Sequence, residues 1–163
     1  DAMLQDLLKQ RGAHQPTVIT PHPLEAARLL QTHTAEVQQD RLLAAQRLAR
    51  LFNCTVVLKG SGSVIAAPGQ TPRINTSGNG RLAIGGTGDV LAGLIGARLV
   101  QGASAFDAAL SAVAQHGQLA NDCGQCHSLQ TCQCRAARNG PRRYGQGAVA
   151  VRQSHRNGQD LRL

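Results

Sequence analysis

A continuous apolar run at residues 55–58 (Thr-Val-Val-Leu) limits the fold of this chain more than any other feature. A half-exposed strand alternates apolar and polar residues, whereas an unbroken run is typical of a strand covered on both faces. Residues 35–52, which precede it, have the spacing of one long amphipathic helix. We expect six apolar side chains to share the buried face of that helix: Val37, Ala44, Ala45, Leu48, Leu51 and Phe52.

The rest of the first 122 residues also alternates between strand and helix patterns. Further strands are predicted at 17–20, 63–67 and 72–75, and further helices at 4–11, from 24 onward, at 89–101 and at 105–121. We expect Gly93 and Gly96 to permit close packing of their helix, and Ser104 with Asp107 to form a capping-box-like helix start. This alternation predicts an α/β sheet with helices on its faces.

The net charge of +8 does not indicate a nucleic-acid partner. Residues 1–122 hold ten Lys/Arg and eight Asp/Glu, whereas residues 123–163 hold seven Arg and one acid. Aromatic residues make up only 2% of the chain, so no basic stripe with stacking aromatics is present. No apolar run is long enough to cross a membrane and no signal peptide is visible, so we expect a cytoplasmic location.

At residue 123 the sequence loses its periodicity and becomes rich in Arg, Cys and Gln. Residues 123–127 (Cys-Gly-Gln-Cys-His) match a c-type haem attachment pattern, and with Cys132 and Cys134 they could equally form a zinc site. Neither is favoured, because haem attachment requires export and the second cysteine pair is cramped. We expect residues 123–163 to be disordered or translated out of frame. By contrast, the lone Cys54 is expected to be a buried apolar residue.

The strongest chemical signal is the glycine-rich stretch 75–93, which contains Gly-Gly-Thr-Gly-Asp at 85–89. Glycines leave backbone N–H groups open to a ligand, and the helix that follows directs its positive end to the same place. Asp89 can take a proton from a hydroxyl while the N–H groups stabilise charge on phosphorus. The alternative is an ordinary turn with a capping Asp. We favour the phosphate site because the loop joins a strand region to an apolar helix.

Two weaker signals leave alternatives open. Residues 59–63 (Lys-Gly-Ser-Gly-Ser) follow the buried strand, where open α/β sheets bind ligands, but they could equally form a simple turn with a solvated lysine. Pro21 and Pro23 hold His22 in a rigid turn that suits a substrate contact, although a lone His is more often structural.

The chain resembles the ADP/ATP-dependent NAD(P)H-hydrate dehydratase family in four motifs and in their order. These motifs are Thr-Pro-His-Pro-x-Glu at 20–25, Val-x-Lys-Gly at 57–60, Asn-x-x-Gly-Asn at 75–79 and Gly-Gly-Thr-Gly-Asp-Val-Leu at 85–91. This family is a branch of the ribokinase-like superfamily. The resemblance covers roughly residues 1–122 and implies the C-terminal part of a three-layer domain with helices on both faces of the sheet. Typical members extend further on the N-terminal side, so we expect a sheet that is incomplete there.

The family repairs hydrated NADH and NADPH by phosphorylating the added hydroxyl with ADP or ATP, after which phosphate leaves. The resemblance implies that Asp89 contacts that hydroxyl as the base, and that Gly86, Thr87 and Gly88 form the anion hole, Gly88 also touching the nucleotide. His22 and Asn79 would contact the substrate, or Asn79 would order the loop or a Mg²⁺-bound phosphate. The nucleotide site would be lined by Lys59, Gly60, Ser61, Gly62 and Ser63.

The resemblance also implies Mg²⁺ with the nucleotide, no resident metal site, a homo-oligomer and a possible fused epimerase domain. Three other functions stay open from the sequence. These are a ribokinase-like kinase acting on a vitamin or sugar hydroxyl, a metal- or haem-binding module built on the tail cysteines, and a fragment without activity.

Overall fold

The structure, a computed structural model, describes residues 2–122; Asp1 and residues 123–163 are not described. The haem, zinc, disorder and reading-frame hypotheses for the tail therefore lie outside the described residues. In chain order the elements are α1 (Ala2–His14), β1 (Val18–Ile19), α2 (Pro23–Leu30), α3 (Thr34–Gln39), α4 (Arg41–Phe52), β2 (Thr55–Leu58), β3 (Val64–Ala66), β4 (Arg73–Ile74), the 3₁₀ turn η1 (Gly80–Leu82), α5 (Thr87–Val100) and α6 (Ala105–Asp122).

The four strands form one mixed sheet in the order β1-β2-β3-β4. β1 pairs with β2 in parallel, with Val18 opposite Thr55, while β3 runs antiparallel to both β2 and β4. It follows that β1, β2 and β4 all point the same way, so their carboxyl ends meet at one edge. The predicted strands are confirmed, although the buried strand belongs to a mixed sheet rather than a purely parallel one.

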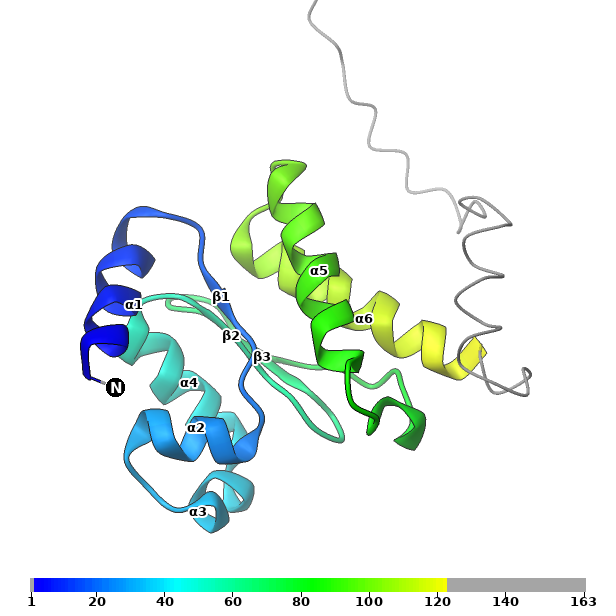
Figure 1. The fold of residues 1–163 in the computed structure, drawn as a ribbon, viewed down its shortest axis with the longest axis horizontal. Helices are drawn as coiled ribbons and strands as arrows, with labels where there is room; N and C mark the ends of the chain where they lie inside the picture. The colour runs from blue at the N-terminus through cyan, green and yellow to red at the C-terminus, as the bar shows by residue number, and fades with distance from the viewer. Residues whose placement is uncertain (1, 123–163) are drawn as a thin grey trace, which may run out of the picture.

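The sheet separates two hydrophobic cores. Val56 and Leu58 face the core beneath α2, α3 and α4, whereas Val57 faces the core beneath α5 and α6. Figure 1 shows α1 to α4 on one side of the strands and α5 with α6 on the other. A strand with cores on both faces can contain only apolar side chains, which explains the unbroken run in β2. The predicted α/β architecture with helices on both faces is confirmed.

The single helix predicted over residues 35–52 is in fact two helices, α3 and α4. Asp40 lies between them with non-helical backbone angles, and its Oδ1 accepts a hydrogen bond from the Leu43 backbone N–H at 2.8 Å. A side chain that caps a new helix start ends the previous helix at the same point. Six apolar residues were predicted for the buried face, and the prediction is wrong for Leu51, which is 41% exposed. The other five are buried.

Two local predictions about α5 and α6 have opposite outcomes. Ser104 and Asp107 do begin α6, with the Asp107 N–H donating to Ser104 Oγ at 3.1 Å and Ser104 Oγ donating to Asp107 Oδ2 at 2.7 Å. Gly93 and Gly96 do not serve close packing, because among the described residues a Cβ at either would meet nothing within 4 Å. No helix in the described part of the chain is long and apolar enough to span a bilayer.

Candidate active site

The candidate site lies at the edge where β1 and β2 end side by side. The Lys59 backbone N–H donates to the Pro21 carbonyl at 2.9 Å, which continues the strand pairing by one more bond. This bond fixes the segment that carries His22 against the turn that carries residues 59–63. The segment around His22 and the turn at residues 59–63, which are far apart in sequence, therefore lie side by side and form one wall of the candidate site.

A residue from α4 holds the turn at residues 59–63 in shape. The Arg41 guanidinium donates to the Leu58 carbonyl at 3.2 Å and to the Ser61 carbonyl. A Cβ at Gly60 would lie 2.8 Å from Arg41 Nη2, and Gly60 has a φ of +147°, so only glycine fits there. Ser63 Oγ donates to the Gly60 carbonyl at 3.2 Å. Burial lowers the pKa of Arg41. Arg41 was not identified from the sequence, because its only signal there was a cation at a helix start.

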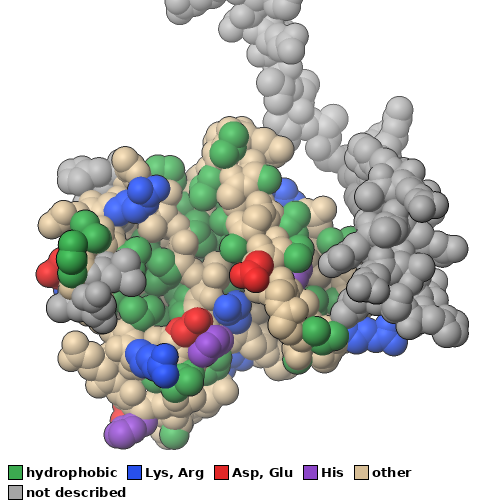
Figure 2. All heavy atoms as spheres, viewed as in Figure 1, with side chains coloured by type: hydrophobic (Ala, Val, Ile, Leu, Met, Phe, Trp, Pro, Cys, Tyr) green, Lys and Arg blue, Asp and Glu red, His purple; other side chains and the backbone are tan. Residues whose placement is uncertain are grey.

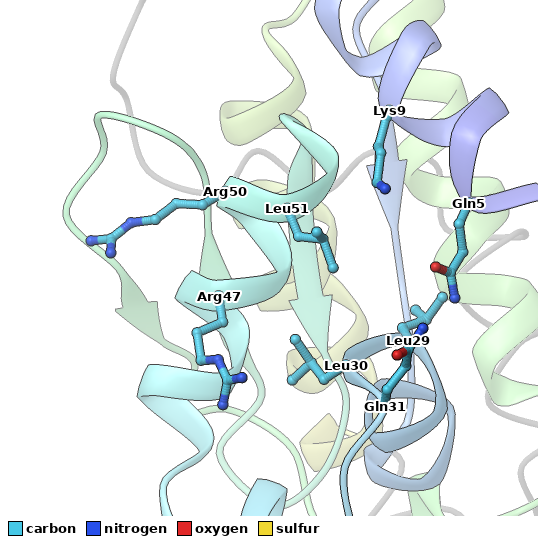
Figure 3. Close-up of a pocket in the computed structure, with 8 residues that line it drawn as sticks. All are labelled: Gln5, Lys9, Leu29, Leu30, Gln31, Arg47, Arg50 and Leu51. Atoms are coloured by element: carbon cyan, nitrogen blue, oxygen red, sulfur yellow. The ribbon is translucent and has the colours of Figure 1, made fainter. Parts of the chain in front are cut away.

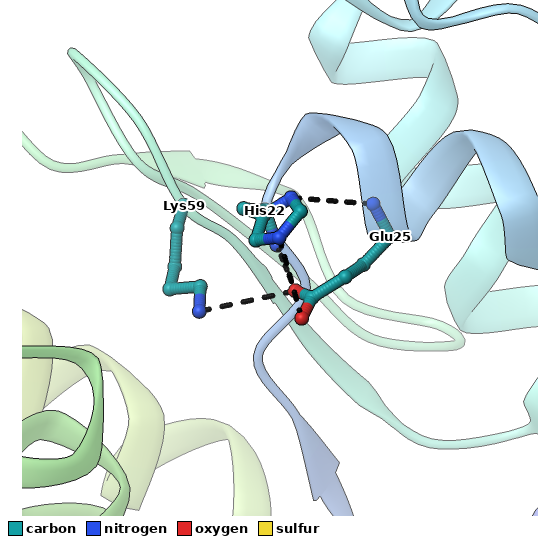
Figure 4. A network of polar contacts seen from close by, with 3 residues as sticks. All are labelled: His22, Glu25 and Lys59. Carbon is teal, nitrogen blue, oxygen red and sulfur yellow. Dashed lines mark hydrogen bonds and ion pairs between the residues drawn. The ribbon is translucent and has the colours of Figure 1, made fainter. Parts of the chain in front are cut away.

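His22 caps the start of α2 and forms a reciprocal pair with Glu25 (Figure 4). The Glu25 N–H donates to His22 Nδ1 at 3.3 Å, and the His22 N–H donates to Glu25 Oε2 at 2.7 Å. The same carboxylate lies 3.4 Å from His22 Nε2 and 3.9 Å from Lys59 Nζ. Glu25 thus links the histidine turn to Lys59. The imidazole has a structural role in the cap, and its side chain is still 46% exposed.

The glycine-rich turn faces this wall from the start of α5. Gly86 is the N-cap with a φ of +88°, and a Cβ at Gly88 would lie only 3.4 Å from Lys59 Nζ. The structure therefore brings the turn and Lys59 together. Figure 2 shows acidic, basic and histidine side chains gathered on the same face, at the junction between the two helical layers.

Three of the four backbone N–H groups at residues 85–88 are open to a ligand. The exception is Thr87, predicted for the anion hole, whose N–H donates to the Ile84 carbonyl at 3.4 Å. Within residues 2–122, the N–H groups of Gly85, Gly86 and Gly88 form no hydrogen bond, and a Cβ at Gly85 or Gly86 would meet nothing within 4 Å. Asp89 lies in the first turn of α5 and is exposed, and its carboxylate forms no hydrogen bond or ion pair with any described residue. Free N–H groups at a helix start can bind an anion, and here one carboxylate lies in the same helical turn.

The side chain of Thr87 stabilises the glycine-rich turn from within the protein. Its Oγ1 lies 2.7 Å from the Leu82 carbonyl and 2.8 Å from the Ile84 carbonyl, to which it donates. His116 of α6 reaches the same residue. Burial lowers the pKa of His116, and a hydrogen bond with the Thr87 backbone partly opposes that shift. His116 was not identified from the sequence, since nothing in its neighbourhood along the chain relates it to the turn.

Asn79 uses its polar atoms within the protein. Its Nδ2 donates to the Ala120 carbonyl at 2.8 Å and lies 3.3 Å from Asn121 Oδ1, while its Oδ1 accepts from the Arg81 N–H at 3.0 Å. These bonds attach the loop to the end of α6. Among the roles considered for Asn79, ordering the loop is the one that this geometry favours.

A surface hollow of about 560 Å³ lies away from the turn, between α1, α2 and α4 (Figure 3). It contains none of the predicted site residues. Its lining combines three leucines with cations and amides: Gln5, Lys9, Leu29, Leu30, Gln31, Arg47, Arg50 and Leu51. The residues that converge by hydrogen bonds and close contact are instead at the strand ends.

Comparison with known protein families agrees with the family resemblance seen in the sequence. The model of the family described as NAD(P)H-hydrate dehydratase matches residues 2–142. The chain belongs to the NAD(P)H-hydrate dehydratase family. It is 47% identical over 104 residues to an ADP-dependent (S)-NAD(P)H-hydrate dehydratase from Neisseria meningitidis, which covers 64% of this chain and 35% of that protein. It is 49% identical over 104 residues to the bifunctional NAD(P)H-hydrate repair enzyme Nnr of Escherichia coli, over 64% of this chain and 20% of that one.

Solved dehydratase-family and ribokinase-like structures have the same fold. The Bacillus subtilis ADP/ATP-dependent NAD(P)H-hydrate dehydratase, co-crystallised with ATP and Mg²⁺, is 34% identical with a TM-score of 0.68, covering 77% of this chain and 48% of that one. A ribokinase-like superfamily protein from Enterococcus faecalis has a TM-score of 0.62 at 27% identity, over 82% of this chain and 56% of that one. The ribokinase-like fold is therefore confirmed. The chain spans about half of these structures and about a third or less of the two relatives above.

Proposed function

We propose that this chain carries the phosphate-handling part of an active site that dehydrates hydrated NADH and NADPH with ADP or ATP. The observation that carries the proposal is the set of unbonded N–H groups of Gly85, Gly86 and Gly88, which lie at the start of α5 beside Lys59, with Asp89 in the same first helical turn. The Neisseria relative is an ADP-dependent (S)-NAD(P)H-hydrate dehydratase and the B. subtilis enzyme was co-crystallised with ATP and Mg²⁺, and both facts support the same reaction here.

In the first step Asp89 takes the proton from the added hydroxyl of the hydrated nicotinamide ring. The hydroxyl oxygen then attacks the terminal phosphorus of the nucleotide, and the bond from that phosphorus to the bridging oxygen breaks. The N–H groups of Gly86 and Gly88 stabilise the charge on the transferring phosphoryl group. Phosphoryl transfer depends mainly on such positioning and charge stabilisation, which matches a site without a covalent nucleophile.

In the second step the phosphate ester leaves as inorganic phosphate. The carbon–oxygen bond breaks, the neighbouring ring carbon loses a proton, and the nicotinamide double bond returns. Lys59 and residues 60–63 would hold the nucleotide phosphates. His22 would contact the hydrated nucleotide, held in place by Glu25, and Asn79 would keep the glycine-rich loop in position.

The described residues fit Mg²⁺ only as an ion that arrives with the nucleotide. They contain no group of three His, Cys, Asp or Glu side chains that could hold a metal. Mg²⁺ usually binds through phosphates with one or two carboxylates, and Asp89 and Glu25 are the carboxylates at this edge. When bound, the ion would offset phosphate charge. We also propose fusion to an epimerase domain, with which the bifunctional name of the Escherichia coli relative is consistent, and a homo-oligomer in the cytoplasm.

The test is turnover of hydrated NADH by this chain with ADP, ATP or no nucleotide. The proposal predicts that NADH absorbance returns only when a nucleotide is present, with release of one phosphate per NADH. No return of absorbance, together with phosphate transfer to a vitamin or sugar hydroxyl, would instead identify a small-molecule kinase.

A further inference from the structure

The glycine-rich loop is attached to α6 over two helical turns. Ser77 Oγ donates to the Ala114 carbonyl at 3.1 Å, and Asn79 Nδ2 donates to the Ala120 carbonyl at 2.8 Å. Gly117 lies between these two bonds and is buried. The loop is therefore anchored on both sides of one glycine.

Gly117 has no room for a side chain. A Cβ there would lie 2.3 Å from Ser77 Oγ and 2.7 Å from both the carbonyl carbon and the oxygen of Ser77. Removing the Ser77 hydroxyl alone would not relieve this contact, because two of the three atoms belong to the backbone. Gly78 also packs here, since a Cβ on it would lie 3.3 Å from Gly117 Cα and 3.2 Å from Leu82 Cδ1.

Further contacts connect Gly78 to the glycine-rich turn at residues 85–88. Leu82, which touches Gly78, offers its carbonyl to Thr87 Oγ1 at 2.7 Å. A route of contacts thus runs from Gly117 of α6 through Gly78 and Leu82 to the first residue of α5.

We infer that Gly117 is a positioning residue for the phosphate-binding turn, setting how far the N–H groups of residues 85–88 lie from α6 and hence from Lys59. This inference rests on the proposed function for its catalytic consequence. Any side chain at position 117 must push the loop outward and carry the turn with it. An error of about 1 Å in the position of catalytic groups can cost roughly a hundredfold in rate.

The variant that tests this is Gly117→Ala, with Gly96→Ala as its matched control. Both positions are glycines inside helices, but a Cβ at Gly96 meets nothing within 4 Å. Alanine favours helix over glycine at both sites, so helix propensity alone does not distinguish the two variants. Any difference between them therefore reports the contact with Ser77.

The first readout needs no ligand. In ¹H–¹⁵N spectra of the 163-residue chain, Gly117→Ala should move the amide resonances of Gly86 and Gly88, whereas Gly96→Ala should leave them in place. Unmoved resonances in Gly117→Ala would overturn the inference. If that variant does not fold by circular dichroism, Asn79→Ala takes its place, since it releases the Ala120 anchor, and the same two amides must move.

The second readout separates positioning from a purely structural role. With a wild-type chain that turns over hydrated NADH, Gly117→Ala should lower kcat by roughly a hundredfold while both KM values stay near wild type, because the N–H groups act on the transition state. A fall in thermal stability with unchanged kcat per folded molecule would contradict the inference. Lack of turnover by the wild type would refute the proposed function and leave the spectral test to judge Gly117.

Discussion

At the scale of single residues, Asp89 is the carboxylate that we propose for the proton transfer, and residues 85–88 contain no other acid or base. Its carboxylate is exposed in the first turn of α5 and has no partner in the described part of the chain. Glu25, the other acid at this edge, is already bonded to the His22 N–H and lies near Lys59. The free carboxylate of Asp89 can approach a substrate hydroxyl, whereas the carboxylate of Glu25 is fixed by its contacts with His22 and Lys59.

Replacing Asp89 by Asn keeps the size of the side chain and removes its basicity. We expect kcat for hydrated NADH to fall by about 10²- to 10⁴-fold, the usual contribution of a general base, with an unchanged melting temperature. Steady-state kinetics and thermal unfolding followed by circular dichroism measure the two quantities. Activity near that of the wild type would remove Asp89 from this role.

Lys59→Ala should weaken ADP binding measured by calorimetry. A hydrogen bond to a charged group contributes about 1.5–3 kcal/mol, so Kd should rise by roughly tenfold to a hundredfold. Arg50→Ala is the control, because Arg50 is a cation that lines the hollow of Figure 3 rather than the turn. Equal losses of affinity in the two variants would indicate a general charge effect and would exclude a specific contact by Lys59.

At the scale of elements, patterns confined to one segment were readable from the sequence and contacts between segments were not. The apolar run of β2 and the Ser104–Asp107 start of α6 are local, and both predictions hold. The break between α3 and α4 was missed because the apolar spacing continues across it, and only the Asp40 cap marks the new start. Gly117 was missed because its meaning depends on Ser77, forty residues earlier in the chain.

The role of Asp40 can be measured by unfolding in urea. Asp40→Ala removes the side chain that accepts from the Leu43 N–H and should lower the free energy of unfolding by about 1 kcal/mol, the usual value for an N-cap. Gln38→Ala, at an exposed position of α3, should change it by less than about 0.5 kcal/mol. If the two substitutions cost the same, Asp40 does not separate the helices by capping.

At the scale of the whole molecule, the topology accounts for the site. The sequence predicted three separate motifs, and the parallel ends of β1 and β2 bring two of them together through the Lys59–Pro21 backbone bond. The third motif, the glycine-rich turn, lies near them because α5 begins at the same edge, with Gly88 close to Lys59. Arg41, Glu25 and His116 could not be assigned in advance, since each acts through a partner that only the fold brings near.

Whether these three motifs form one phosphate site can be seen in a crystal structure of the chain with ADP and Mg²⁺. We expect phosphate oxygens within about 3 Å of the Gly86 and Gly88 nitrogens, with Lys59 Nζ on the same phosphates. A nucleotide whose phosphates lie among Lys9, Arg47 and Arg50 in the hollow of Figure 3, with the turn left empty, would contradict it.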